Sequence, residues 1–134
     1  MESAKGSVRV IKFRAWDVEA KRFIGSDLLH LSFDGRITNS VGELINYADR
    51  YCVMQFTGLS DKNGRDIYEG DIAVRDNEQW IVEWDAEDAG MWFAEPNGKG
   101  RLNIGATCGE AEVVGNIFEH ADMLKPSGNL SLLK

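Results

Sequence analysis

The sequence predicts a mainly β protein, built as a small antiparallel barrel with an N-terminal β-hairpin region and one or two short helices. Short apolar runs recur along the chain, many of them alternate apolar with polar residues, and 14 glycines against 2 prolines separate them. Alternation with a period of two indicates a strand with one buried face, and glycine supplies turns between strands. A sandwich of two sheets would show the same pattern, so the spacing leaves barrel and sandwich open.

The composition excludes several classes of protein. Hydrophobic residues make up 43% and aromatic residues 10% of the 134 residues, which is enough apolar surface for a folded core. No apolar run approaches the roughly 18 residues that a membrane helix needs. Lys and Arg total 15 and Asp and Glu total 22, so the formal net charge of −7 disfavours general binding to phosphate backbones.

The length predicts a single domain, which we place at residues 8–124 between a flexible leader (1–7) and a loose tail (125–134). The leader is polar and lacks the apolar stretch of a secretory signal, so we expect a cytoplasmic protein. Cys52 and Cys108 each stand alone, which is typical of small buried side chains and not of a thiolate metal site. We therefore expect no metal and no cofactor.

The first third of the chain predicts two hairpins. The dipeptide Asp34-Gly35 separates two apolar runs and favours a tight turn, because both central residues of a type I′ turn have positive φ. A polar turn over residues 17–21 allows the following short run to pair back on the first strand. The predicted strands are residues 8–16, 22–24, 28–33 and 36–39.

One segment predicts a helix. Ser40 and Glu43 have the spacing of a capping box, in which each side chain bonds to a backbone N–H of the first helical turn. The apolar residues that follow have the spacing of one helical face. We expect a helix over about residues 41–50, weakened by Gly42.

The remainder of the chain predicts further short strands between polar or glycine-containing turns. A last helical turn is expected over residues 120–124. The predicted strands are residues 52–57, 72–74, 79–84, 91–94, 102–104 and 112–118.

Six motifs, in this order, resemble the YopX family of phage and prophage proteins. They are residues 11–17 (IKFRAWD), 54–59 (MQFTGL), 61–64 (DKNG), 67–72 (IYEGDI), 82–85 (VEWD) and 114–119 (VGNIFE). The resemblance implies a cytosolic protein of phage or prophage origin, with a mainly β fold and an SH3-like barrel in the C-terminal part. It implies no enzymatic activity and supplies no catalytic residue.

Two of these motifs predict structural turns. Asn63 and Gly64 have the composition of a turn tip, and Gly70 can adopt positive φ while Asp71 bonds nearby backbone amides. The alternative is a site at which Glu69 and Asp71 share a cation or a proton. The Asp61-to-Asp66 segment does not have the spacing of a calcium loop.

Charged side chains gather at two places. Glu83, Asp85, Glu87 and Asp88 form an acidic cluster, which we interpret as a solvated strand face with a polar turn. The alternative is a negative patch that imitates nucleic acid. Arg9, Lys12 and Arg14 form a basic stripe on the first strand, for which we expect ion pairs with the acidic cluster across a sheet; a contact with phosphate is the alternative.

The tryptophans are candidates for core and for recognition. Alternation places Trp80 and Trp84 on one face of a strand with Val82, and we expect both to be buried. Trp92 and Phe93 are consecutive, so a strand cannot bury both on one face. We expect Trp92 or Phe93 to be an exposed aromatic that marks an interaction surface.

These observations favour an interaction module without catalytic activity. Its expected partners are proteins of host or phage, or its own copies, with Trp92, Phe93, Lys12 and Arg14 as the candidate contact residues. One alternative is an accessory protein that binds nucleic acid through Lys12 and Arg14. Another is a metal-assisted hydrolase using Glu69 and Asp71, which requires at least three converging carboxylates.

Overall fold

The computed structural model describes residues 10–25, 29–32, 34, 36–39 and 50–124. The predicted leader, the predicted tail and all but the last residue of the predicted helix over 41–50 lie outside these residues. The strands are β1 (Phe13–Asp17), β2 (Arg22–Phe23), β3 (Leu29–Leu31), β4 (Ile37–Asn39), β5 (Tyr51–Ser60), β6 (Asp66–Tyr68), β7 (Asp71–Arg75), β8 (Glu78–Asp85), β9 (Gly90–Ala94), β10 (Arg101–Asn103) and β11 (Glu112–Asn116). The helical elements are α2 (Ile104–Thr107) and the single 3₁₀ turns η1 (Cys108–Glu110) and η2 (Ala121–Met123).

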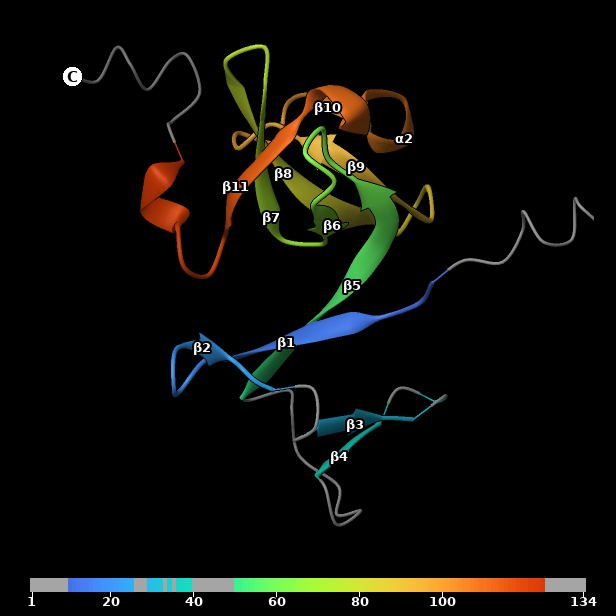
Figure 1. Ribbon diagram of the computed structural model, residues 1–134, viewed down its shortest axis with the longest axis vertical. Helices are drawn as coiled ribbons and strands as arrows, with labels where there is room; N and C mark the ends of the chain where they lie inside the picture. Colours follow the sequence, from blue (N-terminus) through green and yellow to red (C-terminus); the bar gives the residue numbers. More distant parts are fainter. Residues whose placement is uncertain (1–9, 26–28, 33, 35, 40–49, 125–134) are drawn as a thin grey trace, which may run out of the picture. The chain divides into compact units, whose positions relative to one another are not determined.

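The chain divides into two compact units (Figure 1). Phe13–Met54 forms one, here called the hairpin unit, and Met1–Lys12 together with Gln55–Lys134 forms the other, here called the sheet unit. The predicted mainly β class is confirmed. The prediction of a single domain over residues 8–124 stays a prediction.

Two antiparallel hairpins build the hairpin unit, as predicted. In the first, Trp16 of β1 pairs with Phe23 of β2, and their rings meet edge to face with centroids 5.0 Å apart. In the second, β3 pairs with β4 so that Leu31 lies opposite Ile37. The regular part of the first strand begins only at Phe13, and not at residue 8 as the alternation predicted.

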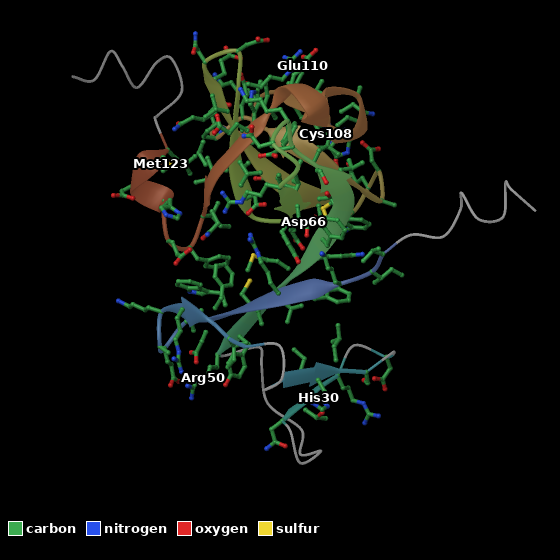
Figure 2. All side chains as sticks on the ribbon, in the orientation of Figure 1. His30, Arg50, Asp66, Cys108, Glu110 and Met123 are labelled. Atoms are coloured by element: carbon green, nitrogen blue, oxygen red, sulfur yellow. The ribbon has the colours of Figure 1, made fainter. Side chains whose placement is uncertain are left out.

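Asp17 closes the first hairpin from a buried position. Its side chain is 1% exposed and accepts hydrogen bonds from the backbone N–H groups of Glu19 and Ala20, each 3.0 Å long. Arg50 donates to the same carboxylate at 3.0 Å (Figure 2). The Arg50 guanidinium and then the amides lower the pKa of Asp17 to about 2.

The sheet unit contains a five-stranded antiparallel sheet in the order β10-β9-β8-β7-β11, curled into a half-barrel (Figure 1). The connection from β7 to β8 is a two-residue loop in which Asp76 and Asn77 have φ of 55° and 64°. Positive φ at both loop residues gives a turn whose twist matches that of the strands, and Asp and Asn tolerate it better than most residues.

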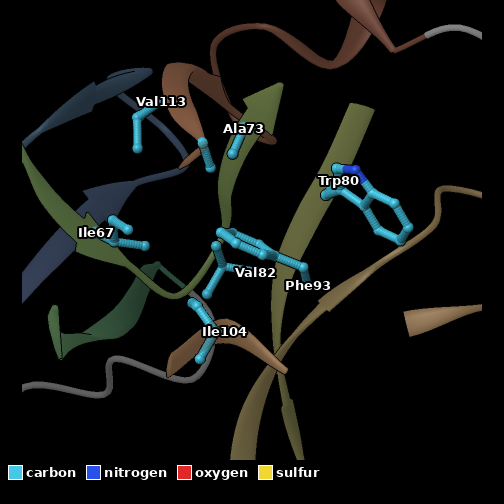
Figure 3. Packing of buried hydrophobic residues seen from close by; sticks show 8 residues of the cluster. Ile67, Ala73, Trp80, Val82, Phe93, Ile104 and Val113 are labelled. Carbon is cyan, nitrogen blue, oxygen red and sulfur yellow. The ribbon is translucent and has the colours of Figure 1, made fainter. Parts of the chain in front are cut away.

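The core of the sheet unit lies on the inner face of this curl (Figure 3). Val82 of β8 lies opposite Phe93 of β9, and Phe93 lies opposite Leu102 of β10. The side chains of these three residues therefore lie next to one another on the same face of the sheet. Phe93 is fully buried. The buried cluster consists of Ile67, Ala73, Trp80, Val82, Phe93, Ile104, Ala111 and Val113.

Asp61 connects the turn after β5 to the edge strand β11. Its buried carboxylate accepts the backbone N–H groups of Asn63 and Arg65 through Oδ1, each at 2.9 Å, and that of Val113 through Oδ2 at 2.8 Å. Burial by itself would raise the pKa of Asp61, but the N–H groups of Val113, Arg65 and Asn63 outweigh it and hold the pKa below its ordinary value. The carboxylate therefore stays charged and fully bonded at neutral pH.

Several predicted strands differ from the structure. β5 continues to Ser60 and does not end at residue 57, β3 ends at Leu31, and β6 (Asp66–Tyr68) forms where no strand was predicted. Two further strands end where a side chain caps the backbone. Ile104 begins α2 and does not close the strand predicted over 102–104, because the Asn103 side chain accepts the N–H of Ala106 and caps the helix. The last strand stops at Asn116 and not at residue 118. The Asn116 side chain accepts the N–H groups of Phe118 and Glu119, which turns the chain away from the sheet. The predicted helical turn over 120–124 is present as η2.

We expect the Asp17 carboxyl to titrate near pH 2 in the folded protein. Because its pKa is lowered, its contribution to the stability of the hairpin unit is complete above the ordinary Asp value of about 3.9 and is lost as the pH falls through about 2. Carboxyl ¹³C shifts measure this titration, and Asp17→Asn removes it. A midpoint near 3.9 in the folded protein would contradict the role given to Arg50.

Replacing Asp61 by Asn should destabilise the sheet unit by about 1–3 kcal/mol, because a neutral amide cannot accept all three buried N–H groups. The free energy of unfolding in urea is the measurement. Asp122→Asn, an exposed acid of η2, is the matched control and should change it by less than about 0.5 kcal/mol. Equal effects of the two changes would refute the special role of Asp61.

Candidate interaction surface

The β8–β9 hairpin exposes the most solvent-accessible tryptophan side chain among the described residues. Alternation along β8 places Trp80, Val82 and Trp84 on one face, and the first two are 6% and 1% exposed. Trp84 is 51% exposed, so the prediction that it is buried is wrong. The strand continues beyond the end of the core, and Trp84 lies opposite Met91, which is itself only half-buried.

The second tryptophan of the hairpin is covered from within the chain. Trp92 lies opposite Glu83, on the sheet face away from the core, and the Arg101 guanidinium carbon lies 4.2 Å from its ring centroid. Trp92 is therefore half-buried. Phe93 points into the core and is 0% exposed, so of the two candidates for an exposed aromatic, Trp92 or Phe93, only Trp92 reaches solvent, and only in part. Phe93 lies opposite Val82. This pairing depends on the register between β8 and β9, which the sequence alone does not give.

Two of the four acids in the predicted cluster belong to an ion-pair network. Arg101 of β10 donates to both Asp85 and Asp88, bridging the strand end and the hairpin loop. The Arg101 hydrogen bond is the main cause that lowers the pKa of Asp85. Glu83 and Glu87 remain exposed. The predicted polar face and turn are therefore present, with Arg101 as a partner that the sequence did not indicate.

We call the end of the β8–β9 hairpin that carries Glu83, Trp84 and Glu87 the Trp84 surface. Trp84 lies on the core side of β8, Glu83 precedes it and faces the other side of the sheet, and Glu87 belongs to the loop closed by Asp85 opposite Gly90. The Asp85 side chain accepts the Glu87 N–H at 2.9 Å and shapes this loop. The surface combines a large exposed aromatic ring with two exposed carboxylates.

The two described residues of the basic stripe lie in different units, and Arg9 lies outside the described residues. Lys12 donates to Asp66 at 2.6 Å, and its ammonium lies 4.6 Å from the centroid of the Phe56 ring (Figure 2). The expected ion pair exists for Lys12, although its partner is Asp66 and not the acidic cluster. The Asp66 carboxylate raises the pKa of Lys12. Arg14, in the hairpin unit, lies over the ring of Phe23.

Both predicted turn motifs adopt the expected geometry. Gly64 and Gly70 have φ of 82° and 88°, which residues with a side chain rarely adopt. Asp71 is 2% exposed and accepts the N–H of Tyr68 at 2.8 Å. Glu69 lies beside Gln55, with a backbone hydrogen bond of 2.9 Å from the Glu69 N–H. The Asp71 carboxylate thus serves the turn, as the structural interpretation predicted.

Metal ligation was the alternative for Glu69 and Asp71. Within the described ranges, no group of three or more His, Cys, Asp or Glu side chains is placed to hold a metal ion. Cys52 and Cys108 are both half-buried, and Cys108 carries a free thiol.

A pocket of about 330 Å³ lies in the hairpin unit. Of the nine described residues that line it, six are apolar, and the two with ionisable side chains are Arg14 and His30. The lining residues are Phe13, Arg14, Ala15, Ile24, Gly25, His30, Leu31, Ile37 and Val53.

The described residues define a mainly β protein with a curled antiparallel sheet, and none of their helices has the length and hydrophobicity to cross a membrane. A family model described as YopX protein matches residues 12–125, and the chain belongs to this family. The crystal structure of protein EF1440 from Enterococcus faecalis is similar, with a TM-score of 0.55 and 24% sequence identity. The match covers 88% of this chain and 100% of that one, and at this identity it supports the fold alone. A comparison with curated proteins gave no match.

Replacing Arg101 by Gln should raise the pKa of Asp85 toward its ordinary value, because the guanidinium hydrogen bond is the main cause of its lowering. The ¹³C shift of the Asp85 carboxyl, followed through an acid titration, is the measurement. Arg75→Gln is the matched control, since Arg75 pairs with Glu110 and Asp76 elsewhere in the sheet unit. An unchanged Asp85 titration in Arg101→Gln would contradict this assignment.

Proposed function

We propose that the protein is an interaction module that binds a protein partner through the Trp84 surface and has no catalytic activity of its own. The observation that carries the proposal is the 51% exposure of Trp84 at the end of a strand whose other apolar residues on the same face, Trp80 and Val82, are buried. Exposing a large aromatic ring to water forfeits the stabilisation that its burial would provide. Tryptophan is also among the residues that most often dominate binding energy at protein interfaces.

The geometry of the hairpin supports this proposal. Arg101 ties Asp85 and Asp88 to β10, so the strands that carry Trp84 and Met91 are held in a defined position. A contact residue on a strand of a rigid sheet loses little conformational entropy on binding. The Trp84 surface is thus preorganised for a partner.

The wider setting of the module is part of the same proposal. We place its action in the cytoplasm of a host cell that carries a phage or prophage, and we expect an SH3-like arrangement in its C-terminal part. The resemblance of the family motifs supports the origin, and the curled antiparallel sheet supports the arrangement. A nucleic-acid role has less support, because Lys12 is already paired with Asp66.

Replacing Trp84 by Ala should abolish capture of the partner. The full chain, carrying the photo-crosslinking residue p-benzoylphenylalanine in place of Met91, is used to capture proteins from host cells. We expect a protein that crosslinks to the chain with Trp84 and is lost in Trp84→Ala. Ile11→Ala is the matched control, because Ile11 is a 59% exposed apolar residue of the same unit and should leave capture intact.

Three results would overturn the proposal. They are capture that persists in Trp84→Ala, capture that is lost equally in Ile11→Ala, and recovery of DNA or RNA fragments without a crosslinked protein. A crosslink between two copies of the chain that depends on Trp84 would identify the protein itself as the partner.

A further inference from the structure

The chain repeatedly covers its aromatic rings with its own cations. Arg101 lies 4.2 Å from the Trp92 centroid, and Lys12 lies 4.6 Å from that of Phe56. In the hairpin unit, Arg14 covers Phe23 at 4.9 Å. A cation over a ring face is attracted by the electron density of the ring, and the attraction is strongest for tryptophan.

Trp84 is different from these rings. In the part of the chain that the structure describes, no Lys or Arg lies over the Trp84 ring, although half of the side chain is open to solvent. The exposed part of the side chain is therefore available to a cation from another molecule.

The charge around Trp84 favours such a cation. Residues 78–94, which form the β8–β9 hairpin, contain five acidic residues and no Lys or Arg. Arg101 of β10 pairs with Asp85 and Asp88, which leaves Glu83 and Glu87 exposed without an ion pair among the described residues. This end of the hairpin is thus negative, with Glu83 on the sheet face opposite Trp84 and Glu87 in the loop. Negative charge attracts a positive partner and repels nucleic acid or a second copy of this chain.

We infer that the partner of the Trp84 surface presents a basic segment, in which one Arg or Lys side chain stacks on the Trp84 indole while the positive charge of the segment is attracted to Glu83 and Glu87 at the same end of the hairpin. This inference rests on the proposed function and specifies the chemistry of the partner. Arginine fits best, because its planar guanidinium stacks on an aromatic ring.

The test is a titration of the ¹⁵N-labelled full chain with hexa-arginine and, separately, with hexa-glutamate, followed by NMR. The Trp84 indole N–H signal is assigned from the spectrum of Trp84→Phe. We expect hexa-arginine to shift this signal in a saturable manner and hexa-glutamate to leave it unchanged. The apparent affinity for hexa-arginine should fall when NaCl is added, because the charges are exposed and salt screens them.

Variants separate the ring from the carboxylates. We expect the affinity for hexa-arginine, followed by the amide of Asp85, to fall about two- to fivefold in Trp84→Ala. The double variant Glu83→Gln with Glu87→Gln should weaken binding by a similar factor, about two- to fivefold. Glu78→Gln is the matched control, since Glu78 is an exposed acid at the opposite end of β8 and should change affinity by less than about 1.5-fold.

The inference is wrong if hexa-arginine leaves the Trp84 signal unchanged, if hexa-glutamate shifts it equally, or if the double variant behaves as Glu78→Gln does. Its failure is distinguishable from failure of the proposed function, because capture of a protein partner through Trp84 does not depend on the sign of the partner's charge. Capture that is lost in Trp84→Ala but unaffected by salt and by the double variant would overturn the basic partner and leave the interaction module standing.

Discussion

The buried carboxylate of Asp61 is the interaction on which the rest of the sheet unit depends. The turn after β5 and the edge strand β11 are 52 residues apart in sequence at the Asp61–Val113 bond, and the side chain of Asp61 bonds both. A backbone hydrogen bond from Lys62 to Ala111 runs beside it. Because an unpaired buried N–H is costly, this carboxylate holds the turn after β5 against β11, whose own place in the sheet is set by its pairing with β7. Val113 of β11 lies opposite Ala73 of β7 and is buried in the core.

The exposure of Trp84 follows from a mismatch between a strand and its core. The eight residues of β8 extend beyond the buried cluster, whereas β10 on the far side of β9 has only three residues. Arg101 compensates for part of this mismatch, because it covers Trp92 and holds the hairpin loop through two carboxylates. Its ion pairs are partly exposed, so we assign them to positioning the hairpin and not to overall stability.

The comparison of Trp84 with Phe93 shows where sequence reasoning reaches its limit. Alternation correctly places Trp80, Val82 and Trp84 on one strand face, yet it carries no information on where the core ends along that face. Phe93 is buried because it lies opposite Val82, and Trp92 is covered because Arg101 reaches it from the next strand. Both facts depend on register between strands, which a single sequence does not encode locally.

The sequence by itself determined the mainly β class, the family, and the turns at Gly64 and Gly70. These features depend on local alternation, on motif order and on the rarity of positive φ in residues other than glycine. Only the tertiary structure decided that Lys12 pairs with Asp66, that Arg101 binds Asp85 and Asp88, and that Trp84 is open to solvent. Each of these depends on which residues of distant strands meet, and that is set by packing of the whole sheet unit and not by any short stretch of chain.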